Sequence, residues 1–399
     1  MPTELAYHTD PFCWEFDAEI VRQTILSDGR IGVILPKTFF YPTGGGQEHD
    51  VGTLGEARVT DVMMDDAGDV IHIVDRAVSG LVHATIDGKR RFAFMQHHSG
   101  QHLLSAAVLQ AQHIESISAN INIDTPSTID LDTNADLDLT PSEDLANAII
   151  WQDRPIKTYV VDETRLQTIP LRRPPQVSES IRIVEIKGLD YCACGGTHCT
   201  RTGMIGIVKI VKTEHVNKKL RVHFVCGERA LQYFQNTHSI VTRVARQMDT
   251  HPDHILDALT KQHQALDAMQ KELQELRELK LSIEAKQLVT RAQAFNSFRL
   301  ITASFRNRLA QELRVLGMQL QNEPGIVAML ASYDGAKVSL VMACAADTQL
   351  DANDLLRAIL ADIHGRGGGD ARLAQGGGTA SEEWFTTLPA KVEQILASR

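Results

Sequence analysis

Apolar and polar residues alternate in the first 90 residues, a pattern that predicts short strands. The segments with this pattern are residues 31–42, 55–65, 69–76 and 81–87. Gly and Asp turn signals separate them, and such spacing is typical of a small barrel or sandwich. We therefore expect a small N-terminal β-barrel domain over residues 1–90.

The pattern becomes helical after residue 94, where Leu103, Leu104, Ala107 and Val108 recur at helical spacing. It predicts a buried helix over residues 95–110. A second helix is expected at 144–151, and strands are expected at 116–123, 157–163, 180–188, 203–216 and 220–227. Helices against an antiparallel sheet would form a central α/β two-layer domain over residues 91–230.

Residues 228–293 contain no glycine and a single proline, Pro252. Within them, apolar residues repeat at sevens in two series: Leu259, Leu266 and Leu273, then Met269, Leu276 and Ile283. This is the a/d seam of a long helix, predicted over residues 231–293. Fewer than four heptads are present, so packing on the rest of the chain and a coiled-coil contact with a second copy both remain open.

The last hundred residues alternate between strand and helix patterns and predict a separate α/β domain over residues 294–399. Strands are expected at 298–305, 325–333 and 337–345, and helices at 307–320 and 354–363. Glycine runs at 365–370 and 375–378 follow. Turn chemistry and backbone contact with phosphates both explain these runs. The whole chain is thus predicted to be a multidomain α+β protein.

Charge and cysteine usage narrow the functional classes. The formal net charge of −10 over 399 residues argues against a protein that coats nucleic acid indiscriminately. Among the 6 cysteines, Cys192, Cys194 and Cys199 crowd together, which suggests metal chemistry rather than a disulfide framework. The N-terminus lacks the features of a signal peptide, and no apolar run approaches the roughly 20 residues of a membrane span. A cytoplasmic protein without a membrane contact is expected.

Two short motifs supply metal-ligand residues. His98 and His102 stand at positions i and i+4 of the predicted helix, so both imidazoles project from one face. Cys194 and His198 flank two glycines and a threonine that allow a tight loop. Three nitrogens and one sulfur match tetrahedral zinc and disfavour magnesium or calcium. A core helix with incidental histidines beside a structural cysteine cluster is the alternative.

Three strings resemble one family: YPTGGGQ at 41–47, MQHHSGQHLLS at 95–105 and CACGGTH at 192–198. They are similar to the free-standing alanyl-tRNA editing proteins of AlaX type and to the editing domain of alanyl-tRNA synthetase. The string IHGRGGGDARLAQGGG at 363–378 resembles the DHH-associated domain that ends the long form of these proteins. The four candidate ligands fall on the metal-ligand positions of that family. The neighbouring His97 should face away, since it lies about 100° round the helix from His98.

The resemblance implies a Zn²⁺-dependent hydrolase that removes serine, and possibly glycine, from mischarged tRNA(Ala). Gln101 and Thr197 are candidates for contacting the serine hydroxyl, and Gly195 and Gly196 for offering amides to the ester carbonyl. Further substrate contacts are expected from Gly44, Gly45, Gly46, Gln47, Arg366 and Arg372. For Thr197, a hydroxyl that bonds only to its own loop is an equal explanation. A homodimer would form through the long helix or the C-terminal domain.

Four protein ligands normally mark a closed, structural zinc, whereas Lewis-acid catalysis needs an open position. Either the ion loses or gains a ligand in the complex, or it orients the substrate while other groups activate water. We favour the second, although no Glu follows His98 to act as base. The main alternative function is a zinc-stabilised tRNA-binding module without catalysis. The motifs of a zinc deaminase are missing from this sequence. A DHH phosphoesterase is also not expected, because Asp253 and His254 are followed by isoleucine.

Overall fold

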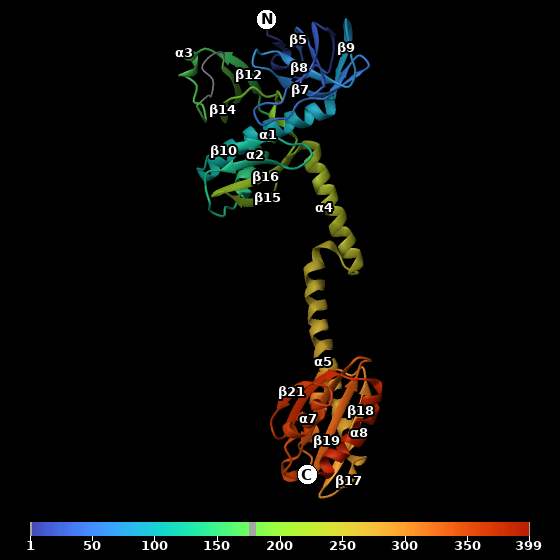
Figure 1. Cartoon of the computed structure of the whole chain (residues 1–399). Helices are drawn as coiled ribbons and strands as arrows, with labels where there is room; N and C mark the ends of the chain where they lie inside the picture. The colour runs from blue at the N-terminus through green and yellow to red at the C-terminus, as the bar shows by residue number, and fades with distance from the viewer. Residues whose placement is uncertain (1, 175–180, 399) are drawn as a thin grey trace. The chain divides into compact units, whose positions relative to one another are not determined.

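The computed structural model describes residues 2–174 and 181–398, and the chain forms two compact units, Met1–Val244 and Ala245–Arg399. Each unit has its own sheets and helices (Figure 1). This mixture of antiparallel and parallel strands with helices confirms a multidomain fold of mixed α and β structure. The finer division into domains at 1–90, 91–230, 231–293 and 294–399 stays a prediction.

A curled antiparallel sheet makes up the N-terminal part of the first unit (Figure 1). Its order is β2-β9-β6-β7-β8-β4-β3. The strands are β2 (Glu15–Glu19), β3 (Arg22–Ile25), β4 (Ile31–Ile34), β6 (Gly52–Leu54), β7 (Ala57–Met64), β8 (Val70–Val74) and β9 (Leu81–Ile86). The β-rich segment predicted at 31–42 contains two short strands, because β4 stops before Pro36, which cannot donate a ladder hydrogen bond. The residues after it form the short β5 (Lys37–Thr38), which pairs with β1 (Glu4–Leu5). Closure of this sheet into a barrel stays a prediction.

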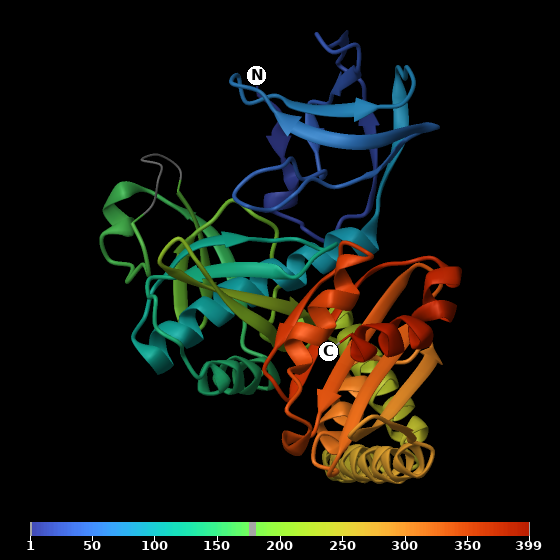
Figure 2. The ribbon, with the colours of Figure 1, turned by 60° about the horizontal axis from the view of Figure 1, so that its bottom comes forward.

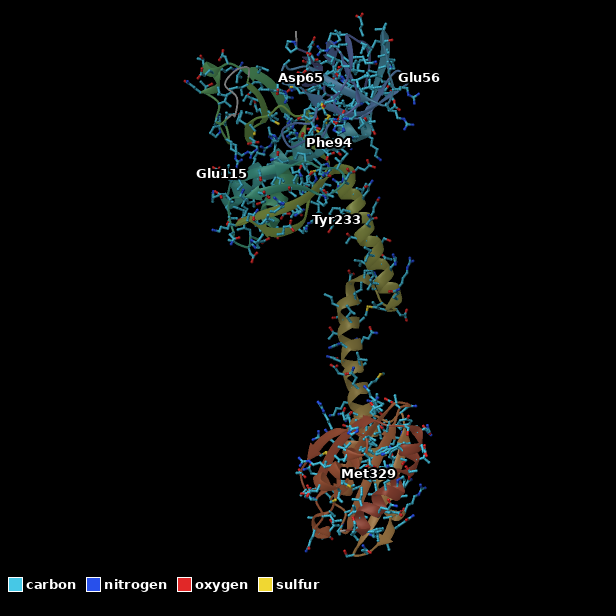
Figure 3. The ribbon with its side chains drawn as sticks, in the orientation of Figure 1. Glu56, Asp65, Phe94, Glu115, Tyr233 and Met329 are labelled. Carbon is cyan, nitrogen blue, oxygen red and sulfur yellow. The ribbon has the colours of Figure 1, made fainter. Side chains whose placement is uncertain are left out.

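The central helix α1 (Gly88–Gln112) carries the first pair of candidate ligands. It begins earlier than predicted because Asp87 caps it, accepting a hydrogen bond from the Arg90 amide at 3.0 Å. Its middle is buried on every side, from Phe94 (Figure 3) to Val108. Gly100 permits this close packing, since a Cβ there would lie 2.4 Å from the Cys226 sulfur.

Two smaller antiparallel sheets complete the first unit. One has the order β10-β11-β16-β15 and the other β12-β13-β14. Their strands are β10 (Ser116–Asn120), β11 (Ser127–Leu131), β12 (Ile156–Val161), β13 (Ile181–Ile186), β14 (Asp190–Ala193), β15 (Val208–Val216) and β16 (Lys219–Cys226). The helices beside them are α2 (Thr140–Trp151), α3 (Glu163–Leu166) and the 3₁₀ turn η2 (Thr202–Ile205), whereas the 3₁₀ turn η1 (Ala6–His8) contacts β5. The strand predicted at 203–216 is therefore partly wrong, because its start is η2. The first residue of the strand predicted at 180–188 lies outside the described residues.

The predicted long helix at 231–293 is two helices, α4 (Gly227–Gln247) and α5 (Ile255–Thr290). Pro252 separates them. It opens the 3₁₀ turn η3 (Pro252–His254), and a proline there has no amide hydrogen for a continuing helix. The heptad residues lie on α5, where they are exposed: Leu259 46%, Leu266 50%, Met269 65%, Leu273 49%, Leu276 55% and Ile283 50%.

The second unit is built on a sheet of order β17-β18-β19-β20-β22-β21. Its elements are β17 (Gln293–Phe295), β18 (Phe298–Arg306), β19 (Ile326–Tyr333), β20 (Lys337–Cys344), β21 (Arg366–Gly369), β22 (Leu373–Thr379), α6 (Ala310–Leu320), η4 (Ala346–Thr348), α7 (Ala352–Ala361) and α8 (Glu382–Ala397). Alternate residues of β19 face opposite cores: Met329 (Figure 3) packs with α7 and α8, whereas Ala328 and Leu330 pack with α5 and α6. Figure 2 shows α7 and α8 in front of this sheet.

The two glycine runs are strands, so the interpretation as plain turns is wrong. Gly367 pairs with Gly376 between β21 and β22. A Cβ on Gly376 would lie 2.7 Å from the Leu360 side chain of α7, so the run lets this helix approach the sheet closely. Across residues 2–174 and 181–398, no helix combines the length and apolar character needed to span a bilayer.

Candidate metal centre

The structure brings His98, His102, Cys194 and His198 together. The two histidines of α1 lie one turn apart, and the loop that follows β14 supplies the cysteine and the third histidine. One donor atom from each residue lies within 4.8 Å of the other three. All three histidines are buried and the cysteine is half-buried. Two segments almost a hundred residues apart in the sequence thus converge on one point.

The loop reaches this point because residue 196 is glycine. A Cβ on Gly196 would lie 2.1 Å from Cε1 of His98, so a larger residue would push the loop away from the helix. Arg182 on β13 holds the same loop through its Nη1, which donates to the carbonyl oxygens of Cys194 at 2.8 Å and Gly196 at 2.9 Å.

The Cys194 sulfur has the surroundings of a thiolate ligand. It lies 3.3 Å from Nε2 of His98 and 3.4 Å from Nε2 of His198. Burial alone would raise the pKa of this thiol, but the charges of the two imidazoles outweigh burial and bring the pKa well below its usual range. By contrast, burial raises the pKa of Cys199 to about 12. Of these two thiols, Cys194 is therefore the one suited to a metal.

The second ring nitrogens of the three histidines face other groups. His98 Nδ1 lies 2.7 Å from Oε1 of Gln47, and His198 Nδ1 lies 3.3 Å from the Ser99 hydroxyl. His102 Nδ1 lies 3.6 Å from a carboxylate oxygen of Asp190 and is buried without a hydrogen-bond partner among the described residues. Such outer contacts orient the rings of metal-bound histidines.

Asp190 is itself held in place. Arg172 donates from Nε to its Oδ1 at 2.8 Å. Burial would lower the pKa of His102, but the neighbouring Cys192 and Asp190 outweigh it, and the pKa is well above its usual value. Burial likewise works against ionisation of Asp190, yet contact with His102 and Arg172 keeps its pKa below its usual value.

The four ligands fit a zinc ion. Three imidazole nitrogens and one thiolate form the donor set of a tetrahedral zinc site, and a thiolate disfavours hard cations such as Mg²⁺. Nδ1 of His102 is buried and has no hydrogen-bond partner within residues 2–174 and 181–398, which also fits, because the second nitrogen of a metal-bound imidazole carries a hydrogen that it can donate. The four residues therefore form a cluster that could hold a metal ion.

Two of the residues predicted to contact substrate lie beside the cluster. Gln101 is 8% exposed, and its Nε2 donates to the Ser105 hydroxyl at 2.9 Å. The Thr197 side chain is fully buried, and its hydroxyl accepts a hydrogen bond from Nε2 of Gln47 at 2.9 Å. The Thr197 hydroxyl thus bonds to a distant residue rather than only within its own loop.

The two loop glycines differ in what their backbone groups do. The Gly196 amide donates to the Cys194 sulfur at 3.4 Å, so it is directed at the thiolate. Gly195 would have open space around a Cβ, and its carbonyl oxygen lies 3.0 Å from Nε2 of His8. Contact of either amide with an ester carbonyl stays a prediction.

The remaining predicted residues are distributed over both units. Gly44, Gly45, Gly46 and Gln47 form a turn in which Gly45 and Gly46 have φ of +56° and +82°, as glycine allows. In the second unit, Arg366 is exposed and lines a cavity of about 710 Å³ with Arg314 and Gln375. Arg372 is turned toward the end of α6, where its Nη2 donates to Gln321 O and Asn322 Oδ1, both at 2.9 Å.

Sequence reasoning missed Arg182, Asp190 and Arg172, which support the cluster from outside. The available signal was Arg182 itself, a charged residue inside the apolar run IRIVEI. Charged residues are almost never fully buried unless they have partners. The expectation for His97 is confirmed, because its Nδ1 donates to Ala93 O at 2.8 Å and its Nε2 accepts from the Cys226 amide at 3.1 Å.

Part of this cluster lies in a segment that is similar to a known protein family. Residues 181–221, which include Cys194 and His198, match the family described as Threonyl and Alanyl tRNA synthetase second additional domain. Alanine–tRNA ligase of Ignicoccus hospitalis is 31% identical over 100% of this chain and 44% of its own length. The same enzyme of Methanopyrus kandleri is 29% identical over 94% of this chain and 43% of its own length.

The C-Ala domain of alanyl-tRNA synthetase from Aquifex aeolicus is a further similar structure. It is 28% identical, with a TM-score of 0.23, over 25% of this chain and 96% of that domain. The chain spans less than half the length of the ligases it matches. It is thus related in sequence to one part of alanine–tRNA ligases, and the match over residues 181–221 supports a relationship to the alanyl-tRNA editing domain.

Proposed function

We propose that this chain is a zinc-dependent hydrolase that removes wrongly attached serine from tRNA(Ala), acting in trans as a free-standing editing protein of the long AlaX type. One observation carries the proposal: three buried histidines and a half-buried cysteine, a donor set of zinc type, converge at one point, and two of these four residues lie in the segment related to the editing domain. Glycine on tRNA(Ala) is a second expected substrate. A cytoplasmic location stays a prediction.

Discrimination requires a group that recognises the serine hydroxyl, which alanine lacks. We propose that Gln101 supplies it, since this residue follows the cluster ligand His98 by three positions on α1. Its Nε2 is already bonded to Ser105, whereas its Oε1 makes no hydrogen bond within residues 2–174 and 181–398. That oxygen is free to accept from a serine hydroxyl. Thr197, already bonded to Gln47, is the second candidate.

When bound, zinc would supply positive charge beside the esterified ribose and the amino group of the substrate. His98, His102, Cys194 and His198 would hold it, and Arg182 would keep the loop of Cys194 closed. Gly195 and Gly196 are proposed to lie against the ester carbonyl. In the second unit, Arg366 and Arg314 line a cavity whose other described lining residues are uncharged, a setting suited to tRNA phosphates. Arg372 would contribute only if it left α6.

The decisive experiment is incubation with tRNA(Ala) carrying labelled serine, glycine or alanine. Serine should be released at least about 100-fold faster than alanine, because a site that binds the hydroxyl leaves a polar group unpaired with alanine. Release of all three at one rate, or of none, would reject proofreading. A zinc-stabilised tRNA-binding module remains the alternative, since four protein ligands are typical of structural zinc. That module would bind tRNA without releasing serine, and chelation would unfold it.

We also propose that a second copy of this chain covers the exposed heptad face of α5. In a parallel pair, Glu272 would stand at position g and face Arg277 at position e of the second copy, which is an attractive contact. The variant with Leu266→Asp and Leu273→Asp should shift the protein from dimer to monomer in sedimentation velocity. Gln264→Asp, on the outer face of the helix, should leave the dimer intact. A wild-type protein that is monomeric at about 100 μM would contradict the proposal.

A further inference from the structure

Gln47 stands at the end of a glycine turn that carries it into the interior of the first unit. The turn is closed by hydrogen bonds in both directions between Gly44 and Gln47, at 3.0 and 2.9 Å. It is anchored to the next sheet by the Ile121 amide, which donates to Gly46 O at 2.8 Å. A Cβ on Gly46 would lie 2.9 Å from Ala119 O, so the glycine is required for this approach. As a result Gln47 is only 1% exposed.

The hydrogen bonds around Gln47 fix the orientation of its side-chain amide. The backbone amide of Thr197 lies 3.4 Å from Oε1, and a backbone N–H can only donate. The oxygen therefore faces Thr197 N, and Nε2 donates to the Thr197 hydroxyl at 2.9 Å. The same Oε1 lies 2.7 Å from Nδ1 of His98, so that nitrogen must carry the hydrogen.

This hydrogen on Nδ1 decides which nitrogen of His98 can bind a metal. In a neutral imidazole only the other nitrogen, Nε2, keeps a free lone pair. Nε2 is the atom that lies 3.3 Å from the Cys194 sulfur, at the centre of the cluster. Gln47 bonds at once to a residue of the helix half and to one of the loop half of the site. Both groups of its amide face protein partners, which is the arrangement of a supporting residue rather than of a substrate contact.

We infer that Gln47 is a positioning residue that sets the tautomer of His98 and thereby the metal affinity of the site. The inference rests on the proposed function only in assuming that the four ligands bind zinc. It assigns the glycine turn a role in assembling the metal site, because without this turn the buried amide could not reach the helix. Outer partners of this kind change metal affinity by about 10- to 100-fold when they are removed.

Two variants of the full chain separate hydrogen bonding from packing. Gln47→Met keeps the volume but removes the acceptor, and should weaken zinc by about 10- to 100-fold in chelator competition. Gln47→Glu keeps an acceptor for Nδ1–H and should bind within about threefold of the wild type or more tightly. With Co²⁺ bound in place of Zn²⁺, the visible absorption spectrum should change in the Met variant and stay as in the wild type in the Glu variant. Gln96→Met is the matched control, because Gln96, on α1, is also a buried glutamine, but its one side-chain hydrogen bond within residues 2–174 and 181–398 is the one it donates to Met204 O.

The tautomer of His98 can be measured directly in the wild-type protein. Long-range ¹H–¹⁵N spectra of the zinc-loaded wild type should show the hydrogen of His98 on Nδ1. A hydrogen on Nε2, or equal weakening of zinc by the Met and Glu variants, would overturn the inference. If the wild type bound neither Zn²⁺ nor Co²⁺, the assumption that the four residues bind a metal would be rejected, and the inference with it. The deacylation assay would then test the proposed function separately.

Discussion

Replacement of Cys194 by alanine should remove zinc and abolish the release of serine from tRNA(Ala). Zinc sites of four ligands contribute about 10–16 kcal/mol of binding free energy, so one ligand in four is worth about 2.5–4 kcal/mol. That share corresponds to a loss of about 100- to 1000-fold in zinc affinity. The lost sulfur is also the acceptor for the Gly196 amide, so the loop itself should loosen. Zinc content after dialysis and the deacylation rate are the two measurements.

The neighbouring thiol provides the matched control for this result. Cys192 is half-buried and two residues away, but it is not among the four converging ligands. Cys192→Ala should therefore keep zinc and activity close to the wild-type values. Full zinc occupancy in Cys194→Ala, or loss of zinc in Cys192→Ala, would mean that the wrong thiol has been assigned.

The four candidate metal ligands were predictable from the sequence because helical spacing and a Cys-Gly-Gly-Thr-His string fix local geometry. His98 and His102 must share a face of any helix that contains them. The resemblance to a family then indicated that the helix pair and the loop pair form one site. Spacing alone could not show that residues almost a hundred positions apart would meet.

The support of the cluster was not predictable in the same way. Gln47 was expected to contact substrate because of the family resemblance, yet the partners of its side chain in the structure are His98 and Thr197. A contact between side chains far apart in the sequence produces no regular spacing of residues by which a single sequence could predict it. The strands β21 and β22 were missed for another reason: glycine is depleted in strands, and only the packing of α7 explains its use there.

A buried ion pair joins α1 to the segment that carries Gln47. Arg91 lies seven residues before His98 on α1, and therefore on the same face, while Asp50 follows Gln47 by three residues. Nε of Arg91 lies 2.9 Å from each carboxylate oxygen, and the two side chains are 0% and 1% exposed. The pair thus ties the start of α1 to the strand-rich part of the unit, and holds the glycine turn near the ligand helix.

Arg91→Met should lower the free energy of unfolding by about 3–5 kcal/mol, because it leaves a buried carboxylate without its counter-charge. Urea unfolding followed by tryptophan fluorescence measures this. Arg76→Met removes an exposed ion pair with Asp75 and should cost less than about 0.5 kcal/mol. Adding Asp50→Asn to Arg91→Met should recover part of the loss, since no unpaired charge then remains. A loss below about 1 kcal/mol in Arg91→Met would show that the pair does not hold these segments together.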